Sequence, residues 1–225
     1  MAIQVKLGNM GTQCVGFYSH VNVGSSDPSY KRFGTVQLIN CQVDGDLTQG
    51  VGGTDITNFI MIGGWVNCPA ANNAIGPGGL VNTISGVTVT NGSRGIEPGV
   101  GSSSVTITNC TLNVQGGWNC TAIWLDGANM TVDIEDCMVT QSPGAGTWFI
   151  RSRNSGMVII SKNNTVGCDG YLYIMEVGGA PASFTADNNT YPAQGVNARA
   201  ANWGSGDLTY AQYKTLTGQD SHSTP

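Results

Sequence analysis

Charge is scarce in this chain: Asp, Glu, Lys and Arg together make up only 10% of its 225 residues. The nine basic residues are scattered, and the net charge is −5 with a pI of about 4.7. The sequence therefore predicts no nucleic-acid partner, because no cluster of Lys and Arg is available to neutralise a run of phosphates. Histidine is scarce as well, with two residues, and the seven cysteines contain no CxxC pair, so we expect no zinc site.

A long apolar run is also missing. The first residues, MAIQVKLGNMGTQC, contain no basic start followed by an apolar stretch, which predicts neither a signal peptide nor a membrane partner. The protein then either folds in a cytoplasm or begins inside a longer chain. Together with cysteines that look reduced, this favours a virion protein or an excised domain of an extracellular protein. Disorder is not expected, because 40% of the residues are hydrophobic.

What the chain does contain is a segment that recurs every 22 to 27 residues. The clearest copies are VQLINCQV from Val36, VTITNCTL from Val105 and VDIEDCMV from Val132. Each copy contains a short strand with alternating apolar residues, then a polar step, which is an Asn or Asp residue, then a small residue and a second strand. Such a repeat, built from β-formers and accompanied by 33 glycines, is typical of a β-solenoid. The residue after the polar step marks each repeat and occurs at Cys41, Trp65, Val87, Cys110, Cys137, Asn163 and Asn188.

The pattern predicts an all-β fold, a right-handed parallel β-helix of about seven coils over residues 36–190. Residues 1–35 are expected to form an N-terminal coil or cap, and residues 191–225 a C-terminal helix-loop cap. In that cap, the Thr209 and Gln212 side chains fit a capping box that opens a short helix, and Gly218 fits its end.

Cysteines and asparagines occupy fixed positions in the repeat. Cys41, Cys110 and Cys137 are expected to stack inside the solenoid as small buried thiols. A bridge between Cys110 and Cys137 is the alternative, since adjacent coils lie about 4.8 Å apart. The pairs Asn163-Asn164 and Asn188-Asn189 fit turn positions, where Asn tolerates a left-handed backbone and its amide can bond to the next coil.

The end of the chain carries the most specific motifs. DNNTYP from Asp187 is followed by LTYAQYKTLTGQDSHS from Leu208. This stretch resembles the C-terminal end of right-handed parallel β-helix proteins of the pectate-lyase-like superfamily, in which D-x-N-x-Y leads to a short aromatic-marked helix and G-Q-D-x-H-S. The resemblance implies a polysaccharide partner and, by analogy with phage tailspikes, a homotrimer. It assigns no catalytic residue in this chain.

A second series of strands lies between the markers: RGIEPG from Arg94, TAIWLDG from Thr121, TWFIRSR from Thr147 and GYLYIMEV from Gly170. Strand alternation predicts that Trp124, Phe149 and Tyr173 point outward in one column. Such a column suits a groove for sugars, because flat rings cover the apolar faces of pyranoses. Equally, it suits packing against a loop or another subunit.

Charged side chains are expected in the next outward column. Asp126, Arg151 and Met175 would lie there, with three further charged residues nearby. A glycoside hydrolase needs two carboxylates, and a lyase needs a base beside a second cation or Ca²⁺, although no acidic cluster here plainly suits calcium. The candidate catalytic residues are Glu97, Asp126 and Arg151. The candidate substrate-binding residues are Trp118, Trp124, Phe149, Arg153, Tyr173 and Glu176.

Three functions remain open at this point. The first is a polysaccharide-recognising β-helix, of the phage tailspike or extracellular glycan-binding type, without required catalysis. The second is a structural or assembly component of a virion or extracellular oligomer, in which the outward apolar column packs between chains. The third is a polysaccharide lyase or glycoside hydrolase. We rank recognition first, because no catalytic set can be matched.

Overall fold

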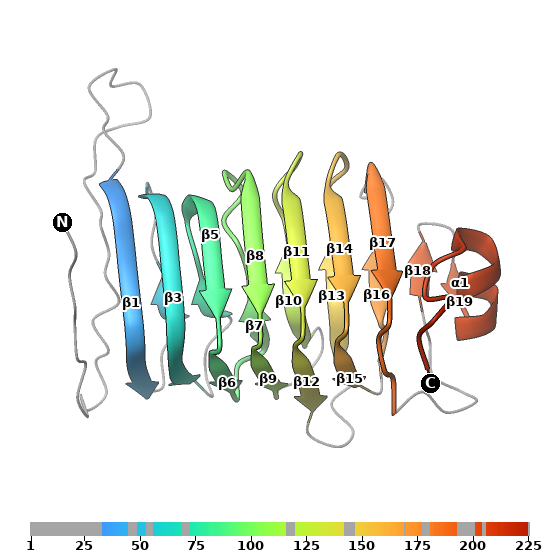
Figure 1. Ribbon diagram of the computed structural model, residues 1–225, viewed down its shortest axis with the longest axis horizontal. Helices are drawn as coiled ribbons and strands as arrows, with labels where there is room; N and C mark the ends of the chain where they lie inside the picture. Colours follow the sequence, from blue (N-terminus) through green and yellow to red (C-terminus); the bar gives the residue numbers. More distant parts are fainter. Residues whose placement is uncertain are drawn as a thin grey trace.

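The computed structural model describes residues 33–44, 49–52, 56–68, 73–115, 120–141, 147–168, 170–176, 181–192, 201–203 and 206–224. Its strands stack in parallel, turn upon turn, and a single helix, α1 (Tyr210–Thr217), lies at the C-terminal end of the stack (Figure 1). The expected all-β parallel solenoid with a C-terminal helix is confirmed. The assignments of residues 1–32 and 193–200 to caps lie outside the described residues.

Two sheets run the length of the solenoid. The long strands of the first sheet are β1 (Phe33–Asp44), β3 (Ile56–Asn67), β5 (Gly79–Ser85), β8 (Ser104–Thr108), β11 (Thr131–Glu135), β14 (Val158–Lys162) and β17 (Ser183–Asp187). After a corner, the same sheet continues in β6 (Thr88–Thr90), β9 (Thr111–Val114), β12 (Met138–Gln141) and β15 (Thr165–Gly167). The second sheet contains β2 (Gln49–Gly52), β4 (Asn73–Gly76), β7 (Arg94–Ile96), β10 (Thr121–Leu125), β13 (Trp148–Ser152), β16 (Tyr173–Met175), β18 (Ala201–Trp203) and β19 (Asp207–Leu208).

The solenoid has about five turns rather than the expected seven. The turns that begin at β3, β5, β8, β11 and β14 each add strands to the long run, the corner run and the second sheet. The first and last markers in the sequence, Cys41 and Asn188, lie at the two ends of the stack, in β1 and directly after β17, and each is followed by a stretch outside the described residues. Counting every marker as a full coil therefore overestimates the number of turns.

Each turn bends at one residue with a left-handed backbone. These corner residues have φ between 51° and 66°, a conformation that Gly, Asn and Asp adopt at low cost. The expectation for Asn163 and Asn188 is thus confirmed. The seven corners are Asn40, Gly63, Gly86, Asn109, Asp136, Asn163 and Asn188.

The residue after each corner faces the interior. Cys41, Cys110 and Cys137 are buried there and form no disulfide, so the stacked arrangement is confirmed and the bridge between Cys110 and Cys137 is not formed. Three markers were placed one residue off, because Gly-Gly and Asn-Asn pairs leave the position ambiguous in sequence. Cys41 pairs with Gly64, not Trp65. After the last two corners, the inward residues are Asn164 and Asn189. Their side-chain amides form a hydrogen bond of 3.1 Å, as expected of an Asn ladder.

The C-terminal segment closes the last turn. Thr209 and Gln212 form the expected capping box of α1, and Gly218 ends the helix with φ 67°. The chain then returns, and Thr224 pairs in parallel with Thr190. In the described part of the chain, no helix is long and apolar enough to cross a membrane.

Candidate functional site

Six charged side chains gather on the outer face of the second sheet. Glu97, Asp126, Arg153 and Glu176 each directly follow a strand, respectively β7, β10, β13 and β16. Because these strands are parallel and in register, their carboxyl ends meet along one edge of the sheet. Three of the five arginines and two of the three glutamates of the chain lie here. We define the charged cluster as Arg94, Glu97, Trp124, Asp126, Arg151, Arg153 and Glu176.

Trp124 lies at the centre of the charged cluster. Strand pairing sets it opposite Arg151, and Arg94 approaches from the strand on the other side of β10. The guanidinium carbons of Arg94 and Arg151 lie 3.8 and 4.0 Å from the centre of the indole ring, and that of Arg153 lies 5.6 Å away. Such distances are those of cation–π contacts. Trp124 is only 3% exposed, and the guanidinium groups of Arg94 and Arg151 lie over its ring.

Each arginine of the charged cluster also has a carboxylate partner. Arg94 Nη1 lies 2.7 Å from Glu97 Oε2, and Arg151 forms a close ion pair with Glu176. Arg153 lies between two carboxylates, 3.6 Å from Asp126 and 3.5 Å from Glu176. These last two contacts are long, and the Arg153 side chain is 47% exposed. Arg153 is therefore the most accessible and least tightly held cation of the three.

An aromatic strip continues from the charged cluster toward the C-terminal cap. Arg151 lies 5.1 Å from the ring of Trp148, which is half-buried. Trp148 packs edge-on against Tyr171, with ring centres 6.2 Å apart, and the Tyr171 hydroxyl donates to Asp207 next to α1. Trp148 is thus the aromatic ring of this face that solvent reaches, while Trp124 lies beneath its guanidinium groups.

The expected outward aromatic column is wrong for two of its three members. Phe149 and Tyr173 are fully buried in the core, as is Met175 of the next column. The physical reason is that two consecutive residues face inward where the chain enters each strand, which shifts the alternation by one. These inward pairs are Ala122-Ile123, Phe149-Ile150 and Leu172-Tyr173.

The charged residues, by contrast, come together. Glu97, Asp126, Arg151, Arg153 and Glu176 all belong to one network of ion pairs and ring contacts. Their roles in binding or catalysis stay predictions, and Trp118 lies outside the described residues.

Sequence reasoning missed Arg94 and Trp148 as members of this face. The register of the parallel strands identifies them, because Thr121 of β10 pairs with Arg94 of β7 on one side and with Trp148 of β13 on the other.

The charged cluster holds carboxylates and guanidinium groups next to one another. Asp126 and Glu176 converge on one guanidinium, so two carboxylates lie within reach of the same bound group. Two carboxylates are the requirement for glycoside hydrolysis. Among the described residues, no three His, Cys, Asp or Glu side chains form a group that could hold a metal ion. Calcium remains an expectation of the lyase alternative alone.

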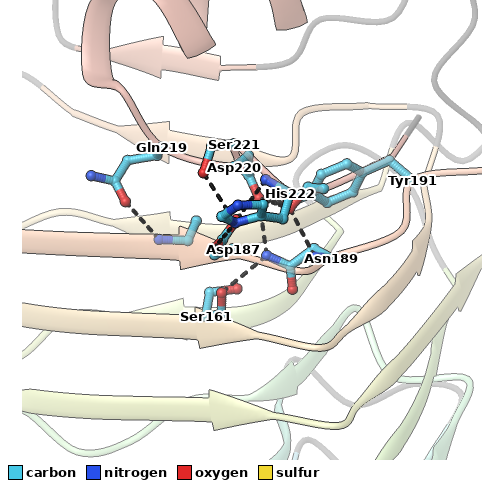
Figure 2. Close-up of polar contacts among 10 residues, drawn as sticks. Ser161, Asp187, Asn189, Tyr191, Gln219, Asp220, Ser221 and His222 are labelled. Carbon is cyan, nitrogen blue, oxygen red and sulfur yellow. Dashed lines mark hydrogen bonds and ion pairs between the residues drawn. The ribbon is translucent and has the colours of Figure 1, made fainter.

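A second polar group lies at the end of the solenoid, where the tail meets the last turn. Figure 2 shows Gln219, Asp220, Ser221 and His222 lying over residues of that turn. His222 Nδ1 contacts Asp187 at 2.7 Å and Ser221 at 3.3 Å. Because both partners meet the same ring nitrogen, no proton relay from serine through histidine to aspartate is formed. His222 lowers the pKa of Asp187 to about 2 through these hydrogen bonds.

Asp220 is the buried centre of this tail. Its carboxylate accepts hydrogen bonds from the hydroxyls of Tyr191 and Tyr213 and from the Asn189 amide, at 2.8, 3.0 and 3.1 Å. Ser223 donates a fourth, at 2.5 Å. The G-Q-D-x-H-S motif therefore closes the end of the fold, because its acid and its histidine bond to residues of the last turn.

Comparison with known proteins adds no relative. No family model, no curated protein and no solved structure matches this chain. The parallel β-solenoid is shown by the structure itself, whereas the likeness of the tail to the pectate-lyase-like superfamily has no family match behind it.

Proposed function

We propose that this chain is a polysaccharide-recognising β-solenoid whose contact surface is the charged cluster with Trp148. The observation that carries the proposal is the concentration of guanidinium, carboxylate and indole groups on one outer face of a chain in which only 10% of the residues are charged. A fold that needed only stability would not require six charged side chains on one exterior face, because exposed ion pairs contribute little.

The groups on this face suit a sugar. Carboxylates and guanidiniums present flat edges with two bonding atoms, which match neighbouring hydroxyls. A half-exposed indole such as Trp148 can cover the apolar face of a pyranose ring. Arg153 and Glu176 lie within one ion-pair distance of each other, so one sugar residue could bond to both.

The test is a glycan-array screen with the purified chain and three variants. Arg153→Gln and Glu176→Gln each remove one charge from the charged cluster, and Glu176→Gln also keeps the side-chain length. Lys162→Gln makes a comparable change on β14 of the first sheet and serves as the matched control. We expect binding to one glycan class that the first two variants weaken roughly tenfold and the control leaves intact, since each loses a charged hydrogen bond.

Two results would contradict the proposal. One is a folded protein that binds no glycan, and the other is binding that the two cluster variants leave unchanged. Analysis of the products released from any bound polysaccharide decides whether recognition is joined by hydrolysis or elimination.

A second candidate function is assembly, supported by an apolar patch on the first sheet. Ile39 and Ile62 are each more than 40% exposed and pair directly across β1 and β3. Val81 is equally exposed on β5, in register with Asn58, four residues along the strand from Ile62. A homotrimer of a virion or extracellular fibre would cover this patch. Light scattering of the wild type and of Ile62→Lys tests this: a trimer that the variant dissociates supports assembly, and a monomeric wild type contradicts it.

A further inference from the structure

The charge of the charged cluster is balanced. Arg94, Arg151 and Arg153 supply three positive charges, and each forms an ion pair with at least one of three carboxylates. An anion that entered would compete with a carboxylate already in place for every guanidinium. It would also approach three like charges on a protein whose net charge is already −5.

The guanidiniums are also covered on their faces. Arg94 and Arg151 lie against Trp124, and Arg151 reaches toward Trp148 as well. A guanidinium that is stacked on an indole and paired with a carboxylate offers a ligand only the remaining N–H groups at its edge. The positive charge of each guanidinium is thus balanced by a carboxylate of the protein. A ligand can therefore bind mainly through directional hydrogen bonds.

Those remaining groups are mixed in kind. The guanidinium edges donate, and the carboxylate oxygens of Asp126 and Glu176, both partly exposed, accept. The indole N–H of Trp124 has no hydrogen-bond partner among the described residues, but it is buried, so it is not one of the groups open to a ligand. A hydroxyl both donates and accepts, so it can satisfy both kinds of group. A carboxylate or sulfate ester only accepts, and it would leave the protein carboxylates without donors.

We infer that the ligand of the charged cluster is an uncharged, hydroxyl-rich glycan and not an acidic one. This inference rests on the proposed function and specifies its substrate class. Recognition then depends on hydrogen bonds to flat, preset edges and on the ring of Trp148, with little attraction acting over long range.

The inference is tested with two polymers that share a backbone and differ in charge, dextran and dextran sulfate, together with every glycan retained on the array. Binding is measured by affinity electrophoresis and calorimetry in 20 and 500 mM NaCl. We expect the bound glycans to be uncharged and their Kd to change less than about twofold between the two salt concentrations, because screening acts on net charge. An acidic polymer that binds more tightly than its uncharged partner, and weakens steeply with salt, would overturn the inference.

Glu176→Gln sharpens the test because it makes the charged cluster net positive. If the ligand is uncharged, losing an acceptor weakens binding, whereas an acidic ligand would bind more tightly to this variant. Lys162→Gln again serves as the control. Binding of acidic glycans alone refutes the substrate class and leaves glycan recognition standing. No binding of any glycan by the folded chain removes the proposed function, and the inference with it.

Discussion

Replacing Asp220 with alanine should unfold the cap before it affects any other part of the fold. Its carboxylate is fully buried and accepts hydrogen bonds from four side chains: Tyr191, Tyr213, Asn189 and Ser223. Removal of the acceptor leaves several buried donors without a partner, and each such group costs about 1 to 3 kcal/mol. Some donors can relax toward one another, as Tyr191 already does with the Tyr173 hydroxyl at 2.7 Å. We therefore expect a loss of about 3 to 5 kcal/mol in the free energy of unfolding, the range found when one partner of a buried charged network is removed.

Urea unfolding followed by circular dichroism measures this loss. Asp133→Ala is the matched control, because Asp133 is half-buried on β11 and its buried oxygen Oδ1 has no hydrogen-bond partner among the described residues that alanine would take away. The control should change the free energy of unfolding by less than about 1 kcal/mol. Asp220→Asn, which keeps one acceptor oxygen, should fall between the two. If Asp220→Ala costs no more than the control, the tail does not hold the solenoid end in the way its hydrogen bonds indicate.

Three further changes test other parts of the fold. Cys110→Val should cost less than about 1.5 kcal/mol in thermal or urea unfolding, since the thiol is buried, free and close in size to valine; loss of folding would contradict its placement. Gly64→Ala should prevent folding, because Gly64 has φ 90° and a Cβ there would lie 2.1 Å from the Cys41 carbonyl oxygen; a soluble variant with the wild-type circular dichroism spectrum would refute the corner geometry. Asp187→Asn should remove part of the acid sensitivity. The pKa of Asp187 is lowered to about 2, below the unfolded value of about 3.9, so its pairing with His222 stabilises the fold above about pH 4 and is lost as the pH falls toward 2. The measurement is the unfolding midpoint of the wild type and of the variant from pH 5 to pH 2. If the difference between the two midpoints stays the same over this range, the prediction is wrong.

Much of the fold follows from local rules that a sequence displays. Each corner needs a residue with a left-handed backbone, which favours Gly, Asn or Asp, and the next residue faces inward. Because this pair of positions recurs in every turn, the period of the solenoid can be recognised in the sequence. The capping box at Thr209 is equally local. These features depend on residues within a few positions of one another, which is why they could be predicted.

The face of the second sheet could not be predicted in the same way. Its strands are entered through two consecutive inward residues, so simple alternation assigns Phe149 to the wrong side. The turns also differ in length: 27 residues separate Trp124 from its strand partner Arg151, and 23 separate Arg151 from Ile174. A column drawn at the average repeat therefore joins residues that are not neighbours. The charged residues were nevertheless named, because alternation predicted Asp126 and Arg151 in an outward column with the others nearby. In the structure, the residues that directly follow the parallel strands meet at one edge of the sheet.

The most direct test of the central claim is the response of the tryptophan indole N–H signals to a glycan retained on the array, followed by ¹⁵N NMR. Trp124→Phe and Trp148→Phe assign the two signals of the charged face, and Trp65, on the other sheet, provides the internal reference. The account predicts that the signals of Trp124 and Trp148 shift in proportion to bound glycan while that of Trp65 stays in place. A shift confined to Trp65, or glycan binding with no change at Trp124 and Trp148, would contradict it.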